Sequence, residues 1–122
     1  EFDAHLQNVP LVNGVPVLTA LLPNADAETL RHMTDRFRQH YPSGVVVLGS
    51  AFQDRPVLIA AITDDLIKRG LQAGNLVKSI AGVIGGSGGG RPNLAQAGGK
   101  DSGRLTEALE QVIPWVKNAL NA

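Results

Sequence analysis

Apolar residues recur along the chain with two periods, one typical of strands and one of helices. Residues 45–48 and 57–62 are nearly continuous runs of Val, Leu, Ile and Ala, with a polar turn at residues 53–55 between them. Such runs are typical of strands that are covered on both faces. The pattern therefore predicts two neighbouring strands in the middle of a sheet.

A second hairpin is predicted near the beginning of the chain. Asn13-Gly14 separates the apolar runs 11–12 and 15–21, and Asn-Gly is the strongest short signal for a two-residue hairpin turn. Prolines beside these runs lack the N–H that a strand ladder uses, so we expect the hairpin near a sheet edge. Residues 1–8 precede this pattern. We interpret them as a cloning or linker remnant ahead of a single globular domain, residues 9–122.

Other apolar positions repeat at helical spacing. Leu30, Met33 and Phe37 predict a helix that begins after an N-cap at Asp26 and ends at Tyr41-Pro42. The two histidines on or near this helix are interpreted as surface residues, because no third metal-binding side chain accompanies them.

Three more helices are predicted in the second half of the chain. A short one begins at Thr63 and stops before Gly70, a longer one spans residues 73–84, and a last one follows Ser102 as its cap. Pro114 should kink or divide the last helix. The single Trp115 is interpreted as a packing anchor, with stacking on a nucleotide as the alternative.

The predicted elements indicate an α/β fold class: a small mixed β-sheet with helices packed on it, ending in a C-terminal helix. Apolar residues make up 43% of the 122 residues, enough for the core of one domain. The chain has no cysteine and therefore no disulfide or thiolate site. No apolar run is long enough to span a membrane and no signal-peptide pattern is present, so we expect a cytoplasmic protein.

Charge is distributed unevenly although the net charge is zero. Residues 1–65 carry four basic and eight acidic side chains, for −4, and residues 66–104 carry six basic and one acidic, for +5. The remaining residues carry one basic and two acidic side chains, for −1. A polyanion is the natural partner for the positive segment.

The positive segment contains residues 84–100, IGGSGGGRPNLAQAGGK, which hold seven of the 14 glycines. Because glycine has no Cβ, backbone N–H groups of such a run can approach a ligand and form an anion-binding concavity. Arg91 and Lys100 add positive charge to the run. We therefore interpret the stretch as a phosphate-binding loop rather than as a flexible linker.

Known catalytic motifs do not fit this stretch. Arg91-Pro92 stands where a P-loop needs Lys and Ser/Thr, and the glycines lack the spacing of a dinucleotide fingerprint. All histidines precede Tyr41, away from a plausible nucleophile. Asp64-Asp65 is interpreted as stabilising a helix N-terminus rather than as binding magnesium. We expect this chain to catalyse nothing by itself and to need no cofactor or metal.

The run GGSGGGRPNLAQAGGK closely resembles the glycine-rich signature of the C-terminal, DHHA1-type domain of alanyl-tRNA synthetases. The resemblance extends from Val9 to the region of Trp115. The sequence departs from the usual signature at Ser87, within an often all-glycine run, and at Asn93, where an acid is common. Further matching residues precede the signature: Asp65-Leu66, Arg69-Gly70-Leu71, Ala73-Gly74 and Leu76-Val77-Lys78.

The resemblance implies a DHHA1-like fold and a tRNA-binding module. Such a module binds the outer corner, or elbow, of tRNA and helps the aminoacylation and editing domains act on the same tRNA. The implied partners are alanine-specific tRNA and the other domains of the parent alanine–tRNA ligase, with non-specific DNA binding as a further expectation. The parent would use ATP, Mg and Zn outside this chain.

Two other functions stay open from the sequence. DHHA1 domains also follow the catalytic domain of DHH-type phosphoesterases, so a substrate-binding domain acting on nucleic acid or nucleotides is the main alternative. A protein-interaction domain is the other. The stretch from Arg91 to Lys100 favours the synthetase.

The expected RNA contacts combine backbone groups, basic side chains and amides. Arg91 should bind phosphate, and its alternative role is to brace the glycine run against a carboxylate such as Asp101. The full set of expected contacts is Lys68, Arg69, Lys78, Gly85, Gly86, Ser87, Gly88, Gly89, Gly90, Arg91, Asn93, Gln96, Lys100 and Arg104.

Overall fold

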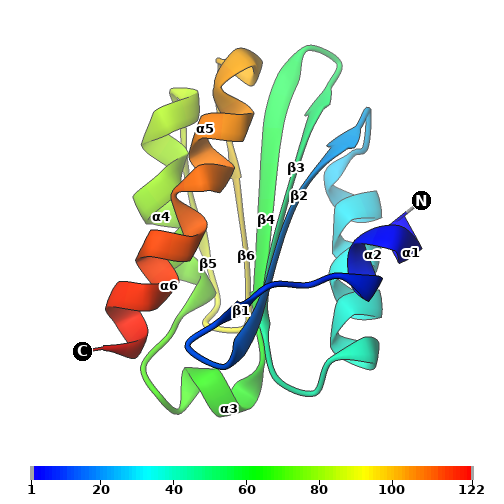
Figure 1. The fold of residues 1–122 in the computed structure, drawn as a ribbon. Coiled ribbons are helices and arrows are strands. Elements are labelled where there is room, and N and C mark those ends of the chain that lie inside the picture. Colours follow the sequence, from blue (N-terminus) through cyan, green and yellow to red (C-terminus); the bar gives the residue numbers. More distant parts are fainter. Residues whose placement is uncertain (1, 122) are drawn as a thin grey trace.

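The computed structural model describes residues 2–121 as a six-stranded mixed sheet with helices on both faces (Figure 1). The strand order is β1-β2-β3-β4-β6-β5; β2 and β3 are parallel, and all other neighbours are antiparallel. The elements are α1 (Phe2–Gln7), β1 (Leu11–Val12), β2 (Val15–Pro23), α2 (Ala27–His40), β3 (Val45–Phe52), β4 (Arg55–Ile62), α3 (Asp64–Ile67), α4 (Ala73–Ala81), β5 (Ser87–Gly90), β6 (Leu94–Gly98), α5 (Leu105–Glu110) and α6 (Val112–Leu120). The predicted α/β class is confirmed.

Two cores lie on opposite faces of the sheet. α1 and α2 cover one face, and α4, α5 and α6 cover the other (Figure 1). Alternate residues of β3 serve the two cores: Val46 and Leu48 pack with α2, whereas Val45 and Val47 pack with the opposite helices. The prediction of doubly covered central strands is therefore confirmed. β3 continues to Phe52, beyond the predicted residues 45–48, through small residues that carry little strand signal.

The predicted turns and first cap are present. Asn13 and Gly14 have φ of 51° and 83°, as a two-residue hairpin turn of this kind requires. Asp26 caps α2, accepting the Thr29 N–H at 2.9 Å. The last predicted cap is wrong: Asp101, not Ser102, accepts the Gly103 N–H, because the segment starts with a 3₁₀ turn over Ser102–Arg104.

The C-terminal helix is divided as predicted. α5 ends at Glu110 and α6 starts at Val112, because Pro114 has no N–H with which to bond the carbonyl four residues earlier. Trp115 is partly buried against the core, which confirms its interpretation as a packing residue.

A short helix precedes the predicted domain. Phe2 and Leu6 of α1 are buried against α2 and β2, and the Tyr41 hydroxyl donates to the Leu6 carbonyl. Residues 2–7 therefore pack on the domain, while the origin of residues 1–8 as a linker remnant stays a prediction. Over residues 2–121, none of the helices combines the length and apolarity needed to cross a bilayer.

Candidate nucleic-acid interface

The glycine run forms a strand, and the prediction of a loop here is wrong. Ser87–Gly90 is β5, the edge strand, paired with β6. A Cβ on Gly86 would lie 1.8 Å from the Gly98 carbonyl oxygen, and one on Gly88 would lie 2.4 Å from that of Gln96. The close approach of two backbones therefore requires these glycines, whether or not a ligand binds.

The turn between β5 and β6 is held on three sides by backbone hydrogen bonds. Arg91 N–H donates to the Leu94 carbonyl at 2.9 Å and closes the turn. The first residue of α4 donates to the Pro92 carbonyl at 2.8 Å, and Ile62 at the end of β4 donates to the Asn93 carbonyl at 3.2 Å. The turn is thus a fixed platform from which the exposed Arg91 side chain projects.

The alternative role of Arg91 as a brace to Asp101 does not occur. Arg91 precedes β6 and Asp101 follows it, so the hairpin separates the two residues. Among the described residues Arg91 makes no ion pair. Its guanidinium is therefore available to an external anion.

A shallow furrow lies between α2 and the β5–β6 hairpin. α2 packs on β3 and β4, which leaves the hairpin uncovered on this face. The furrow has a volume of about 370 Å³. Its lining residues are Arg31, Gly89, Gly90, Arg91, Asn93, Leu94, Ala95 and Gln96.

Five of the predicted contacts meet in this furrow, and one further charged residue, Arg31, joins them. Arg31 comes from α2, about sixty positions before Arg91, and sequence reasoning missed it. Arg31 belongs to the acidic segment of residues 1–65, where no anion site was expected. It also lies on the polar face of an amphipathic helix, and that position predicts only that its side chain is exposed to solvent. Tertiary packing alone places it beside the hairpin.

The other predicted basic residues do not form one patch. Lys78 lies on α4 near Gly89, where a Cβ would come 3.4 Å from the lysine Cε. Lys68 and Arg69 follow α3, at the end of the sheet where the Arg91 turn lies. Lys100 follows β6 at the opposite end of the hairpin, near Gly85.

Arg104 is already engaged. Its guanidinium donates to both carboxylate oxygens of Glu107, at 3.1 and 2.7 Å. These hydrogen bonds raise the pKa of Arg104 and lower the pKa of Glu107. The internal pair competes with phosphate, so Arg104 is a weaker candidate than Arg91.

A second hollow of about 360 Å³ adjoins the furrow, and two aspartates contribute to its lining. It is lined by Arg38, Asp64 and Asp65 among others, and it shares Asn93 with the furrow. Asp65 accepts hydrogen bonds from Ser43 at 2.6 Å and Thr63 at 2.6 Å. Burial opposes ionisation, but these bonds outweigh it and hold the pKa of Asp65 below its usual value. As predicted, both aspartates begin a helix, α3.

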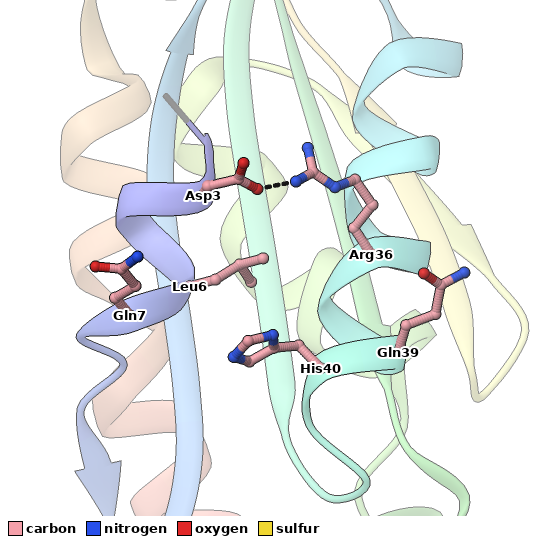
Figure 2. Close-up of a pocket in the computed structure, with 6 residues that line it drawn as sticks. All are labelled: Asp3, Leu6, Gln7, Arg36, Gln39 and His40. Atoms are coloured by element: carbon pink, nitrogen blue, oxygen red, sulfur yellow. Dashed lines mark ion pairs between the residues drawn. The ribbon is translucent and has the colours of Figure 1, made fainter.

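A further hollow lies elsewhere, between α1 and α2 (Figure 2). It measures about 420 Å³, and across it Arg36 forms an ion pair with Asp3. The Arg36 guanidinium also lies 5.6 Å from the centre of the Phe2 ring. Because its charge is compensated, this arginine holds α1 in place rather than offering an anion site.

The described part of the chain contains no cluster of side chains suited to binding a metal ion. Over residues 2–121 there is no group of three His, Cys, Asp or Glu side chains placed to hold an ion. His32 is exposed and lies 3.8 Å from Glu28, and His40 packs against Tyr41. Both histidines are surface residues, as predicted.

Comparison with known proteins gives consistent results. The sequence pattern of the DHHA1 domain matches residues 14–118. Two alanine–tRNA ligases, from Pelotomaculum thermopropionicum and Geobacillus kaustophilus, are 52% and 53% identical to the chain over 109 and 115 residues. These matches cover 89% and 93% of the chain but only 12% and 13% of the two ligases.

Solved structures with this fold are also known. The C-Ala domain of Aquifex aeolicus alanyl-tRNA synthetase matches 94% of the chain and 99% of its own length, with a TM-score of 0.78 and 25% identity. A DHH-domain protein described as a member of a ribosomal protein family matches 95% of the chain and 29% of its own length, with a TM-score of 0.61. Its identity is 20%, so this second likeness shows the fold alone.

Proposed function

The chain belongs to the DHHA1 domain family, and on that basis we propose that it is the tRNA-binding C-terminal module of an alanine–tRNA ligase. The resemblance to the C-terminal domain of alanyl-tRNA synthetases, indicated by the glycine-rich signature, is confirmed. The module would bind the elbow of alanine-specific tRNA and so help the aminoacylation and editing domains act on one tRNA. It would act in the cytoplasm and catalyse nothing itself; ATP, Mg and Zn would serve the parent elsewhere.

One observation carries the proposal: a fixed hairpin turn presents Arg91 without an internal partner among residues 2–121. Arginine donates two parallel hydrogen bonds to phosphate oxygens, so a turn that is already ordered binds RNA at little entropic cost. Lys78 on one side and Lys68 and Arg69 at the same end of the sheet add further phosphate contacts. The phosphoesterase alternative has weaker support, because the DHH-domain protein is 20% identical to the chain whereas the two alanine–tRNA ligases are 52% and 53% identical.

The test is the variant Arg91→Ala, with tRNA affinity measured at several salt concentrations. Because Arg91 is exposed, its loss should weaken binding by about 1 kcal/mol, roughly fivefold, and should flatten the salt dependence. Arg91→Lys should restore part of the affinity, since an ammonium cannot make the paired contact. The melting temperature should not change.

Arg55→Ala is the matched control. Arg55 is exposed and begins β4, whereas the Arg91 turn is bonded to Ile62 at the other end of that strand. Its loss should leave tRNA affinity within about twofold. A destabilised Arg91→Ala protein with unchanged tRNA affinity would contradict the proposed role.

A further inference from the structure

The furrow between α2 and the β5–β6 hairpin has a distinct chemical composition. Guanidinium groups of Arg31 and Arg91 come from its two sides, and Asn93 and Gln96 supply amides. Leu94 is the one large apolar side chain in the lining. Within the described chain no acidic residue lines it, although the neighbouring hollow contains two. This combination matches a nucleotide. The positive charges suit its phosphate, the amides suit the edge of its base, and the small apolar surface suits the face of its base.

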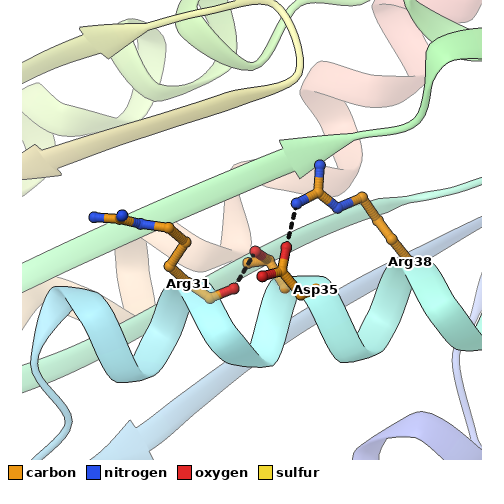
Figure 3. Close-up of polar contacts among 4 residues, drawn as sticks. Arg31, Asp35 and Arg38 are labelled. Atoms are coloured by element: carbon orange, nitrogen blue, oxygen red, sulfur yellow. Dashed lines mark hydrogen bonds and ion pairs between the residues drawn. The ribbon is translucent and has the colours of Figure 1, made fainter.

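Arg31 is free to take part. On the same helix, Arg38 donates to Asp35 at 2.5 Å, so Asp35 has its own partner. Figure 3 shows the Arg31 side chain extending away from that pair. Among residues 2–121 Arg31 makes no ion pair, and it is exposed. Its charge is therefore unsatisfied in the free protein.

The size and the surroundings of the furrow limit what can enter it. A volume of about 370 Å³ is at the lower end of small-ligand sites, which suits one nucleotide and not a duplex. Toward α3 the furrow adjoins the hollow that contains Asp64, Asp65 and Arg38. Since Arg38 is paired with Asp35, the two carboxylates of this hollow disfavour a further phosphate there. On the hairpin side the lining includes Gly89 and Gly90, which have no side chains of their own to occupy the space of a base.

We propose that this furrow holds one unpaired nucleotide of the bound RNA. Arg31 and Arg91 bind its flanking phosphates, Leu94 supports the face of the base, and the Gln96 and Asn93 amides face the base edge. The inference rests on the proposed function and adds to it that the module recognises an unstacked loop nucleotide, in addition to the phosphate backbone.

The experiment compares two ligands: intact tRNA, whose loops offer unpaired bases, and a blunt RNA duplex with the same number of phosphates. Binding of each is measured for the unmodified chain and for Arg31→Gln, Gln96→Ala and the charge-matched control Arg55→Gln. Arg31→Gln should weaken tRNA binding about fivefold and duplex binding less than twofold. Gln96→Ala should weaken tRNA binding about threefold with no change for the duplex. Arg55→Gln should change neither.

Each outcome decides between the two proposals. If tRNA binds the unmodified chain but Arg31→Gln has no effect, or weakens both ligands equally, the nucleotide inference is overturned and the proposed function survives. The same holds if Arg55→Gln matches Arg31→Gln. If the unmodified chain does not bind tRNA, both fail. Melting curves of all variants should coincide, because the Arg31, Gln96 and Arg55 side chains are all exposed.

Discussion

Two antiparallel hairpins meet at β4 and are held together in opposite ways. The β3–β4 hairpin pairs strands rich in Val, Leu and Ile, and most of their side chains are buried. The β5–β6 hairpin pairs Ser-Gly-Gly-Gly with Leu-Ala-Gln-Ala-Gly and has few side chains to bury. The first is stabilised by apolar area removed from water, and the second by backbone hydrogen bonds and close backbone contact.

The difference shows how a sheet can carry a binding surface at its edge. Buried side chains fix β3 and β4 in the centre, where a ligand cannot reach them. The hairpin beside them needs no covering helix on the α2 side, because it exposes little apolar surface there. Its turn and its open face are therefore accessible while its position stays fixed.

The largest expected effect comes from removing atoms in the first hairpin. Leu48 is fully buried on β3, so Leu48→Ala should lower the free energy of unfolding by about 3 kcal/mol through lost burial and a residual cavity. Urea denaturation followed by circular dichroism measures it. Leu21→Ala is the control, because Leu21 is 49% exposed and should cost much less. Equal costs would contradict the comparison.

In the β5–β6 hairpin, adding a side-chain atom to a tightly packed glycine should lower stability. The Cβ of Gly88→Ala would lie 2.4 Å from the Ala97 Cβ, which should cost about 2 kcal/mol in the free energy of unfolding and distort the hairpin. At Gly89 the nearest atom is the flexible Lys78 Cε at 3.4 Å. Gly89→Ala should therefore cost less than about 1 kcal/mol by the same measurement. Similar losses at both positions would mean that the glycines serve general strand flexibility and not close packing.

The smallest effect concerns pH and belongs to the first hairpin only. Asp65 joins the two ends of β3 and β4 through Ser43 and Thr63, and its pKa is lowered in the fold. A lowered pKa stabilises the fold above the unfolded value, near 3.9, and this stabilisation is lost as the pH falls through the folded value. Asp65→Asn should therefore lower stability at pH 7 by about 0.5 kcal/mol after allowance for solvent screening.

The same variant should lose less stability than the original chain between pH 5 and pH 3. Guanidinium unfolding at these pH values and at pH 7 measures the difference. Glu110→Gln removes an exposed carboxylate outside the hairpin, and as the charge-matched control it should change stability at pH 7 by less than about 0.5 kcal/mol. An Asp65→Asn protein with the original pH dependence would show that the hydrogen bonds to Ser43 and Thr63 contribute nothing to folding.

Sequence periodicity was sufficient to predict the helices and strands whose formation depends on a regular pattern of side chains. The apolar runs of β3 and β4, the stripe of α2 at Leu30, Met33 and Phe37, and the division of the last helix at Pro114 follow from local chemistry. Each of these signals depends on which side chains are present and how they alternate. The same chemistry identified the family, because the Arg91–Lys100 signature is local too.

Tertiary structure alone decided the rest. A run of glycines has no periodicity to read, so its conversion into β5 depends on the neighbouring strand β6 and on α4 packed against it. Short α1 carries too little local signal and is ordered by burial of Phe2 and Leu6. Arg31 reaches the furrow only because α2 packs across β3 and β4, bringing together residues distant in the chain. Local propensity indicates which secondary structure a segment favours by itself. A site formed between elements depends instead on which other elements pack beside that segment.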